Sequence, residues 1–487
     1  MNAALAILFL LTGSAIALFI PDKGGAALIF CIMVALVFGY LIGKVESDRR
    51  YLLQLFVAGL LIRMMVGSFI FAFELQEFFG GDAITYDHLG FELLQWYRGL
   101  AEISTTDDTV VWGMPYLVAG IYAIVGRNVL AVQFFNAICG AAAAVVVYVC
   151  AQHIFQNVRV ARVAALLVAF YPSLILWSSQ ALKDAPIVLL LAVAIMATLK
   201  LGEQLSVRYG LLLSGALLGL LSLRFYIFYM VAAAITGAFV IGMKRVTAQN
   251  FGRQFVVIAA LGLMLTYVGV LRTASAQLGA YGNLETMQRS RQDLATAQSA
   301  FGQDVDVSTT SGALSVIPLG MMYLLFAPFP WQMANLRQSI TLPEMMLWWG
   351  SFPLLVLGGW FTLKYRLRQA LPIILFTTML TLAYSIFQGN VGTAYRQRSQ
   401  LLIFYFIFVA VGFVLLKERR EERTRQAMLA RDEIRNKRRR RPPPQEPQIT
   451  AANGGAEQVA SAAEQATGAQ EQATGVAEQT TGAGERG

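Results

Sequence analysis

The sequence predicts an all-α polytopic membrane protein. Hydrophobic residues make up 57% of the 487 residues and charged residues only 14%, whereas a soluble domain carries roughly a quarter charged residues. The apolar residues are also grouped into continuous runs, and in lipid such a run satisfies its backbone hydrogen bonds only as a helix. We therefore expect about twelve transmembrane helices plus two juxtamembrane or re-entrant helices.

The apolar runs define the predicted spans. Each is close to the roughly 17–25 residues that a membrane-spanning helix needs, some at the short end. The runs cover residues 3–20, 25–43, 51–73, 128–150, 160–178, 185–201, 209–223, 226–243, 254–271, 343–363, 370–388 and 399–416. Two further stretches, Trp112 to Gly126 and Val316 to Trp331, are shorter or broken by proline, so we expect them to lie in the interface or to re-enter the membrane.

The basic residues predict the orientation in the membrane, because cytoplasmic loops carry an excess of Lys and Arg. If neither short stretch crosses, the loops that contain Lys44, Lys200 and Lys364 all face the cytoplasm, and so does the basic C-terminal tail. Both termini are then cytoplasmic in a multi-pass protein of the cell (inner) membrane. Arg396 and Arg398 are the exception, since they fall on the outer side.

The net charge of +9 does not indicate a nucleic-acid partner, because the basic residues lie in short loops and in the tail. The expected surroundings are membrane lipids. Cys31, Cys139 and Cys150 all lie in apolar runs, which favours core positions over disulfides or metal ligands. The sequence contains no CxxC, HExxH or P-loop pattern.

The composition divides the chain into three regions. Residues 1–416 form a transmembrane domain, 417–441 a basic cytoplasmic extension, and 442–487 a low-complexity tail that we expect to be disordered. The outer loops of the first region are 74–127, 179–184, 272–342 and 389–398.

The first of these loops carries a cluster of functional side chains. Asp82, Tyr86 and Asp87 follow the pair Gly80-Gly81, which lets the backbone turn sharply. Asp82 is a candidate general base or cation ligand; the alternative is a helix cap. From Asp87 onward the apolar spacing suits a helix that lies along the membrane surface.

A second acid and several arginines fall on the same side. Lys183-Asp184 stands between two apolar runs, either in a site or as a cap of the next helix. Arg396, Arg398 and Arg224 either bind phosphate oxygens, which guanidinium groups match well, or anchor the chain on lipid headgroups. Candidate substrate-binding positions on the outer side also include Trp331 and Arg337.

Arg63 is different because it lies in the middle of a predicted span, where a charge is costly. It either pairs with an acid or a lipid phosphate, or forms a bridge between helices.

The order of the motifs resembles the GT-C superfamily of integral membrane glycosyltransferases. This superfamily includes protein mannosyltransferases, aminoarabinose lipid A transferases and oligosaccharyltransferases. The resemblance covers roughly residues 51–200 and later helices only in outline. The segments that carry it are Gly81-Asp82-Ala83-x-x-Tyr86, Val125-Gly126-Arg127-Asn128, Val132–Ala137, Arg162–Ser173 and Trp177–Asp184. Two features depart from the superfamily: two spans precede the one that matches its first, and no large outer C-terminal domain follows.

The resemblance implies a sugar donor carried on a polyprenyl phosphate or diphosphate and used at the outer face. It implies that Asp82 matches the first-loop acid, the base or acceptor-orienting group, and that Asp184 matches the second-loop acid. The short helix at 112–126 would be the juxtamembrane helix of the superfamily. A divalent cation, Mg or Mn, is a candidate cofactor, with Asp82 and Asp184 as its ligands.

We therefore expect a glycosyltransferase that moves a sugar to a hydroxyl of a glycan, lipid or protein acceptor. Asp82 and Asp184 are the expected catalytic residues, and the lipid phosphate leaves toward the arginines. One alternative is a polysaccharide polymerase or ligase, in which the arginines dominate. Another is a lipid-linked sugar flippase or transporter, for which internal repeats would be typical; the sequence shows no repeat of its halves.

Overall fold

The computed structural model describes residues 3–79, 81–101, 113–241, 262, 283–295, 300–302, 305–333 and 336–439. The chain divides into two compact units, Met1–Arg419 and Arg420–Gly487. Within the described residues all regular elements are helical, apart from one isolated β-bridge between Ala300 and Asn390. The predicted all-α class is confirmed.

The helices before residue 204 are α1 (Ala3–Phe19), α2 (Pro21–Ile42), α3 (Arg49–Ala72), α4 (Gln76–Phe79), α5 (Asp82–Tyr97), α6 (Met114–Val125), α7 (Val129–Phe155), α8 (Val158–Phe170), α9 (Pro172–Ser178) and α10 (Asp184–Glu203). The later helices are α11 (Val207–Leu223), α12 (Phe225–Ile241), α15 (Leu284–Ala295), α16 (Thr310–Phe326), α17 (Leu336–Tyr365), α18 (Leu367–Phe387), α19 (Val391–Gln397) and α20 (Ser399–Arg439), with a short 3₁₀ turn at Pro330–Gln332.

Many of these helices are long and apolar enough to cross a membrane. Seven pass that test in the described part of the chain, or up to eight if the bent pair α8 and α9 is one span. The predicted polytopic membrane protein is confirmed, whereas the count of twelve is not. The predicted span 254–271 lies outside the described residues except at residue 262. The first of the two stretches that we expected not to cross contains the 12-residue α6. The second covers the later part of the 17-residue α16 and reaches the turn at Pro330–Gln332.

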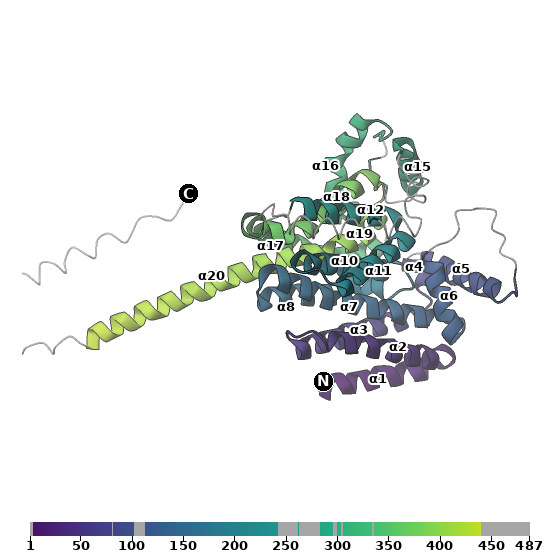
Figure 1. The fold of residues 1–487 in the computed structure, drawn as a ribbon, viewed down its shortest axis with the longest axis horizontal. Helices are drawn as coiled ribbons and strands as arrows, with labels where there is room; N and C mark the ends of the chain where they lie inside the picture. The colour runs from purple at the N-terminus through teal and green to yellow at the C-terminus, as the bar shows by residue number, and fades with distance from the viewer. Residues whose placement is uncertain are drawn as a thin grey trace, which may run out of the picture. The chain divides into compact units, whose positions relative to one another are not determined.

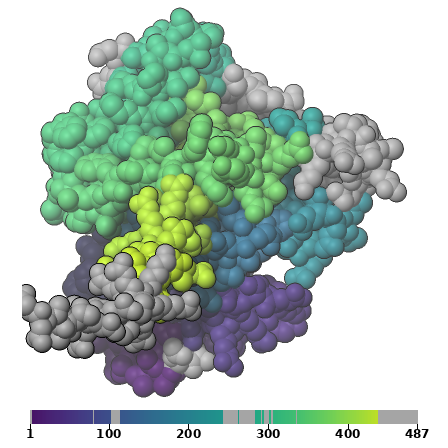
Figure 2. Space-filling view, turned by 90° about the vertical axis from the view of Figure 1, so that its left-hand side faces the viewer, coloured from purple at the N-terminus to yellow at the C-terminus, as the bar shows by residue number. Residues whose placement is uncertain are grey.

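Helix α7 is the centre of the first unit. It contacts α2, α3, α8 and α10, and most of its residues are buried. Its run Ala141–Ala144 presents small side chains, which let neighbouring helices approach closely. Figure 1 shows α1–α3 on one side of α7, while α12, α18 and α16 follow on the other side. In Figure 2 the purple N-terminal helices and the green helices of residues 310–390 accordingly lie at opposite ends of this unit.

The predicted span 160–178 is broken in the structure. Helices α8 and α9 meet at an angle of 54°. The break falls at Pro172, which has no N–H to donate to the carbonyl of Val168, four residues earlier. A carbonyl left unpaired in an apolar surrounding is costly, so the break requires a donor from elsewhere.

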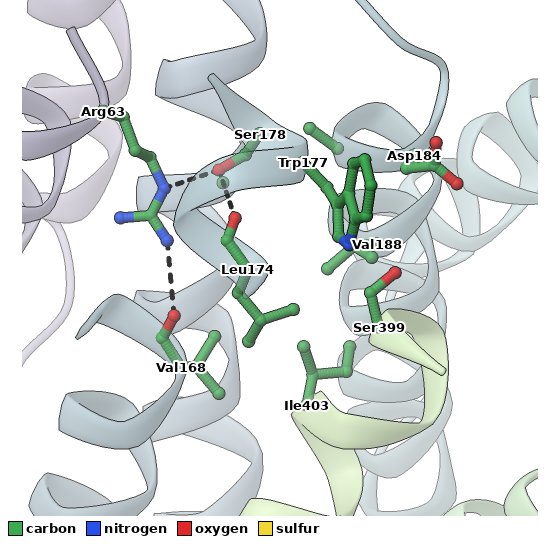
Figure 3. Close-up of a pocket in the computed structure, with 11 residues that line it drawn as sticks. Arg63, Val168, Leu174, Trp177, Ser178, Asp184, Val188, Ser399 and Ile403 are labelled. Carbon is green, nitrogen blue, oxygen red and sulfur yellow. Dashed lines mark hydrogen bonds between the residues drawn. The ribbon is translucent and has the colours of Figure 1, made fainter. Parts of the chain in front are cut away.

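Arg63 of α3 supplies that donor. Its guanidinium group donates to the carbonyl of Val168 at 3.3 Å and to Ser178 Oγ of α9 at 2.7 Å (Figure 3). It also donates to the carbonyl of Ala169 at 2.7 Å. A further bond reaches the carbonyl of Gly59 at 2.8 Å. Every one of these partners is a neutral oxygen. The structure therefore favours the bridge between helices among the roles that the sequence left open for Arg63.

We predict that Arg63→Met destabilises the fold, because it leaves the carbonyls at the α8–α9 break without a donor. The free energy of unfolding should fall by about 2–4 kcal/mol, measured by thermal or denaturant unfolding of the purified protein in detergent. Met65→Leu on the same helix, at a position 51% exposed, is the control. Equal stability of the two variants would contradict the bridging role.

Candidate functional site

Two acids that are far apart in the sequence meet at one guanidinium group. Arg396 Nη1 lies 2.6 Å from Asp82 Oδ2, and Arg396 Nε lies 2.7 Å from Asp184 Oδ2. Arg396 Nη2 is also 2.7 Å from Asp184 Oδ2, although the angles there do not make a hydrogen bond. We call Asp82, Asp184 and Arg396 the bridged acid pair.

Each acid of the pair is the first residue of a helix. Asp82 begins α5 and Asp184 begins α10, and the positive end of a helix dipole favours a carboxylate there. Neither helix has a side-chain cap bond at its start, so the capping alternative does not account for the contacts of these side chains. Gly81 has ordinary helical angles, φ −63° and ψ −12°. The sharp turn that we expected is therefore absent at Gly81, while Gly80 lies outside the described residues.

The two acids differ in exposure. The side chain of Asp184 is 2% exposed, whereas that of Asp82 is 52% exposed. Among the described residues the hydrogen bond and ion pair of Asp82 both use Oδ2, which leaves Oδ1 for an incoming group. Asp82 is thus the acid of the pair that is open to an incoming group.

Two further cations surround the buried acid. Arg224, between α11 and α12, has Nη1 3.9 Å from Asp184 Oδ1. Lys183 directly precedes Asp184, and burial, reinforced by the positive charge of Arg224, lowers the pKa of its ammonium group. The cluster therefore holds three basic side chains, of Lys183, Arg224 and Arg396, against two acids, which attracts an anion.

Aromatic rings form the walls around these charges. The guanidinium carbon of Arg396 lies 5.9 Å from the ring centre of Trp177, and that of Arg224 lies 5.7 Å from Tyr226. Lys183 Nζ lies 6.0 Å from the ring centre of Tyr86. Such cation–π contacts hold the cations in position. Sequence reasoning missed Trp177 and Tyr226 as parts of the site, although each stands near a predicted charged residue.

The phenol of Tyr86 belongs to the same cluster. It is four residues after Asp82, on the same face of α5. Burial, with the negative charge of Asp82 as the next cause, raises its pKa to about 12. Tyr86 therefore stays neutral and can donate a hydrogen bond. Burial alone would lower the pKa of Arg396, but Asp184 and Asp82 together raise it.

The structure does not bring Asp87 into this cluster. Its Oδ2 lies 2.6 Å from Arg127 Nη2, and its Oδ1 accepts a hydrogen bond from Tyr122 at 2.5 Å. Arg127 also covers the ring of Phe91. These contacts tie α5 to α6 and to the turn before α7, so Asp87 is a structural residue here and not a free ligand for substrate.

Two more predicted residues also lie outside the bridged acid pair. Arg398 is 2% exposed and donates to the carbonyls of Leu325 and Ala327, which fixes the end of α16. Trp331 is 77% exposed and stacks on Phe329. Neither side chain contacts the bridged acid pair in the described residues.

Arg337 contacts the segment before Asp82 from another part of the chain. It donates to the carbonyl of Glu77 at 3.4 Å and lies over the ring of Phe78. Arg337 therefore stands at the rim of the site, beside the segment that leads into Asp82.

The bridged acid pair does not fit a divalent cation. In the described residues no group of three or more His, Cys, Asp and Glu side chains is close enough to hold a metal ion. Both oxygens of Asp184 already face guanidinium groups. Magnesium needs near-octahedral oxygen ligation, and three neighbouring cations oppose it.

A family model matches part of this chain. Residues 112–270, which contain α6 through α12 and Asp184, match the model described as dolichyl-phosphate-mannose-protein mannosyltransferase. The predicted resemblance to the GT-C superfamily is confirmed. A search of curated proteins found no match.

Two similar solved structures are archaeal. One is the Archaeoglobus fulgidus oligosaccharyltransferase in complex with Zn and sulfate, at 16% identity and a TM-score of 0.40, covering 65% of this chain and 42% of that chain. The other is the oligosaccharyltransferase AglB of the same organism with an inhibitory peptide and a dolichol-phosphate, at 14% identity and a TM-score of 0.44, covering 79% and 52%. The chain thus spans about half the length of these proteins.

We predict that Asp87→Asn lowers stability in a pH-dependent way. Burial alone would raise the pKa of Asp87, but the bonds from Arg127 and Tyr122 lower it. The ionised acid therefore stabilises the fold above the unfolded pKa of about 3.9, and this contribution is lost as pH falls further. At neutral pH the variant should lose about 1–2 kcal/mol, a low figure because Arg127 is 38% exposed.

The measurement is thermal unfolding in detergent at neutral pH and near pH 3. The stability difference between wild type and Asp87→Asn should narrow at the lower pH. Glu92→Gln, an exposed position on the same helix, serves as the control. A difference that stays constant with pH would show that the ion pair is not its source.

Proposed function

We propose that the protein is a membrane glycosyltransferase that moves a sugar from a polyprenyl-phosphate-linked donor to an acceptor hydroxyl. The observation that carries this proposal is the bridged acid pair, in which an exposed acid and a buried acid share one arginine within a positively charged cluster. The match to a mannosyltransferase family that uses dolichyl-phosphate-mannose supports a donor of this class.

The proposed reaction uses Asp82 as the general base. The acceptor hydroxyl gives its proton to the carboxylate of Asp82 while its oxygen forms a bond to the anomeric carbon of the sugar. The bond from that carbon to the phosphate oxygen breaks, and its electron pair leaves with the lipid phosphate. Oδ1 of Asp82 suits this task because the contacts to Arg396 use Oδ2.

The leaving phosphate needs positive charge. Arg396 and Arg224 offer guanidinium groups, which match phosphate oxygens, and Lys183 offers a point charge. Fixed charges of this kind stabilise the charge that develops on the leaving group. Asp184 is then a positioning residue, because it holds Arg396 and faces Arg224 from its buried place.

The orientation in the membrane is part of the proposal. The positive-inside pattern supports a site on the outer face, both termini in the cytoplasm, and a cytoplasmic basic extension at 417–441. In that position the isoprenoid tail of the donor stays in lipid while its phosphate meets the cluster. A glycan, lipid or protein acceptor would enter from the outer side.

We expect Asp82→Asn to abolish most of the transfer, because an amide cannot accept the acceptor proton. The rate of sugar transfer from a polyprenyl-phosphate donor should fall by about 10²–10⁴-fold. The assay is product formation in membranes or detergent, with folding checked by thermal unfolding. Glu92→Gln is the matched control on α5. Full transfer by a folded Asp82→Asn protein would remove Asp82 as the base, and lipid translocation without sugar transfer by the wild type would favour a flippase.

The ammonium group of Lys183 should make donor binding sensitive to alkaline pH. Burial and Arg224 lower the pKa of Lys183, so its charge is lost at a lower pH than that of an ordinary lysine, about 10.4. Donor affinity should therefore decrease as pH rises through this pKa. Lys183→Arg keeps its charge, and the alkaline limb of kcat/KM should move to higher pH. Lys23→Arg, at an exposed position, should leave the limb in place, and an unmoved limb in Lys183→Arg would contradict this assignment.

A further inference from the structure

We propose that the guanidinium group of Arg396 is a built-in cation, which takes the place of a divalent metal ion between Asp82 and Asp184. Only the transfer assay depends on the proposed function; the metal-binding test does not. Its first observation is geometric: one side chain places nitrogen atoms 2.6 Å from one carboxylate and 2.7 Å from the other. A metal ion that bridged these acids would have to occupy the space of this group.

The surroundings of Arg396 hold it between the two acids. Its side chain is 16% exposed, and the ring of Trp177 lies 5.9 Å from its guanidinium carbon. Its backbone belongs to α19. The side chain of Asn390 caps this helix by accepting bonds from the N–H groups of Gly392 and Thr393. The cation is thus covalently attached to a short capped helix and cannot be lost by dilution or chelation.

The charges also oppose a second cation. Arg224 lies 3.9 Å from the oxygen of Asp184 that Arg396 does not contact. Lys183 is next to Asp184 in the chain, so its ammonium group adds to the positive charge around the buried acid. A divalent ion would add two positive charges to a cluster that has an excess of one, whereas an anion would relieve the excess.

A single arginine can perform the two tasks that a bridging metal ion would perform. It holds the two carboxylates at a fixed separation, and it presents positive charge to the phosphate of the donor. The remaining N–H groups of a guanidinium fork allow the second task while the acids stay bound. Asp82 therefore remains oriented without a loosely bound ion.

The test uses Mn²⁺ as the probe and electron paramagnetic resonance of the purified full-length protein as the readout. The wild type should bind no stoichiometric Mn²⁺. Arg396→Gln removes the built-in cation and should gain one Mn²⁺ site, which should disappear in the double variant Arg396→Gln/Asp184→Asn. Arg396→Lys retains a positive charge and should bind none.

Arg127→Gln is the matched control, because it removes a guanidinium group from a single carboxylate, that of Asp87. It should gain no Mn²⁺ site. Stoichiometric Mn²⁺ binding by the wild type would overturn the proposal without any variant, even if Arg396→Gln fails to fold. A folded Arg396→Gln protein without Mn²⁺ binding would also overturn it.

A transfer assay adds a second readout. Wild-type transfer should be unchanged by an excess of EDTA, and Arg396→Gln should lose at least about 100-fold in rate. Loss of wild-type transfer in EDTA, restored by Mg²⁺ or Mn²⁺, would overturn the built-in cation but leave the glycosyltransferase proposal intact. The absence of any sugar transfer by the wild type would instead contradict the proposed function, while the Mn²⁺ result would still decide the role of Arg396.

Discussion

A buried carboxylate needs a positive partner, and this constraint shapes the site. Asp184 is almost completely buried, and a buried charge without a partner costs several kcal/mol. Its partner Arg396 comes from α19, 212 residues later, and the same guanidinium group reaches Asp82 at the start of α5. The three helices α5, α10 and α19 are therefore joined at their ends by one charged group.

Arg63 of α3 also satisfies buried polar groups, close to the segment that carries Asp184. It donates N–H groups to the carbonyl oxygens that lose their helical donors at the break between α8 and α9. It also donates a hydrogen bond to Ser178 at the end of α9. The segment that follows Ser178 leads directly to Asp184. Figure 3 shows Arg63 and Asp184 along the same small cavity, with Trp177 between them. The buried arginine of α3 thus supports the segment that carries the buried acid, although the two side chains share no contact in the described residues.

The sequence predicted which face the charged residues share, but not which of them meet. The order of the loops and the positions of the basic residues predicted that Asp82, Asp184 and Arg396 lie on one side of the membrane. Arg398 had the same evidence as Arg396, yet it binds carbonyls inside the fold. Two residues along a helix differ by about 200° in direction, and packing between helices decides which one faces the site. The break at Pro172 was likewise not predicted, because residues 160–178 form one continuous apolar run. Hydropathy depends on the side chains and does not detect that a proline lacks an N–H group.

The charge balance of the cluster connects its geometry to the proposed donor. Two acids face Lys183, Arg224 and Arg396, so the cluster carries one excess positive charge when Lys183 is protonated. In a half-buried site such an excess is unfavourable. Burial, and next the positive charge of Arg224, lower the pKa of Lys183. A phosphate diester with a single negative charge balances the excess, and its binding should return Lys183 toward its ordinary pKa. A diphosphate would reverse the excess, and a divalent cation would enlarge it. The proposed lipid monophosphate donor, and the proposed arginine in place of a metal ion between the acids, both agree with this charge balance.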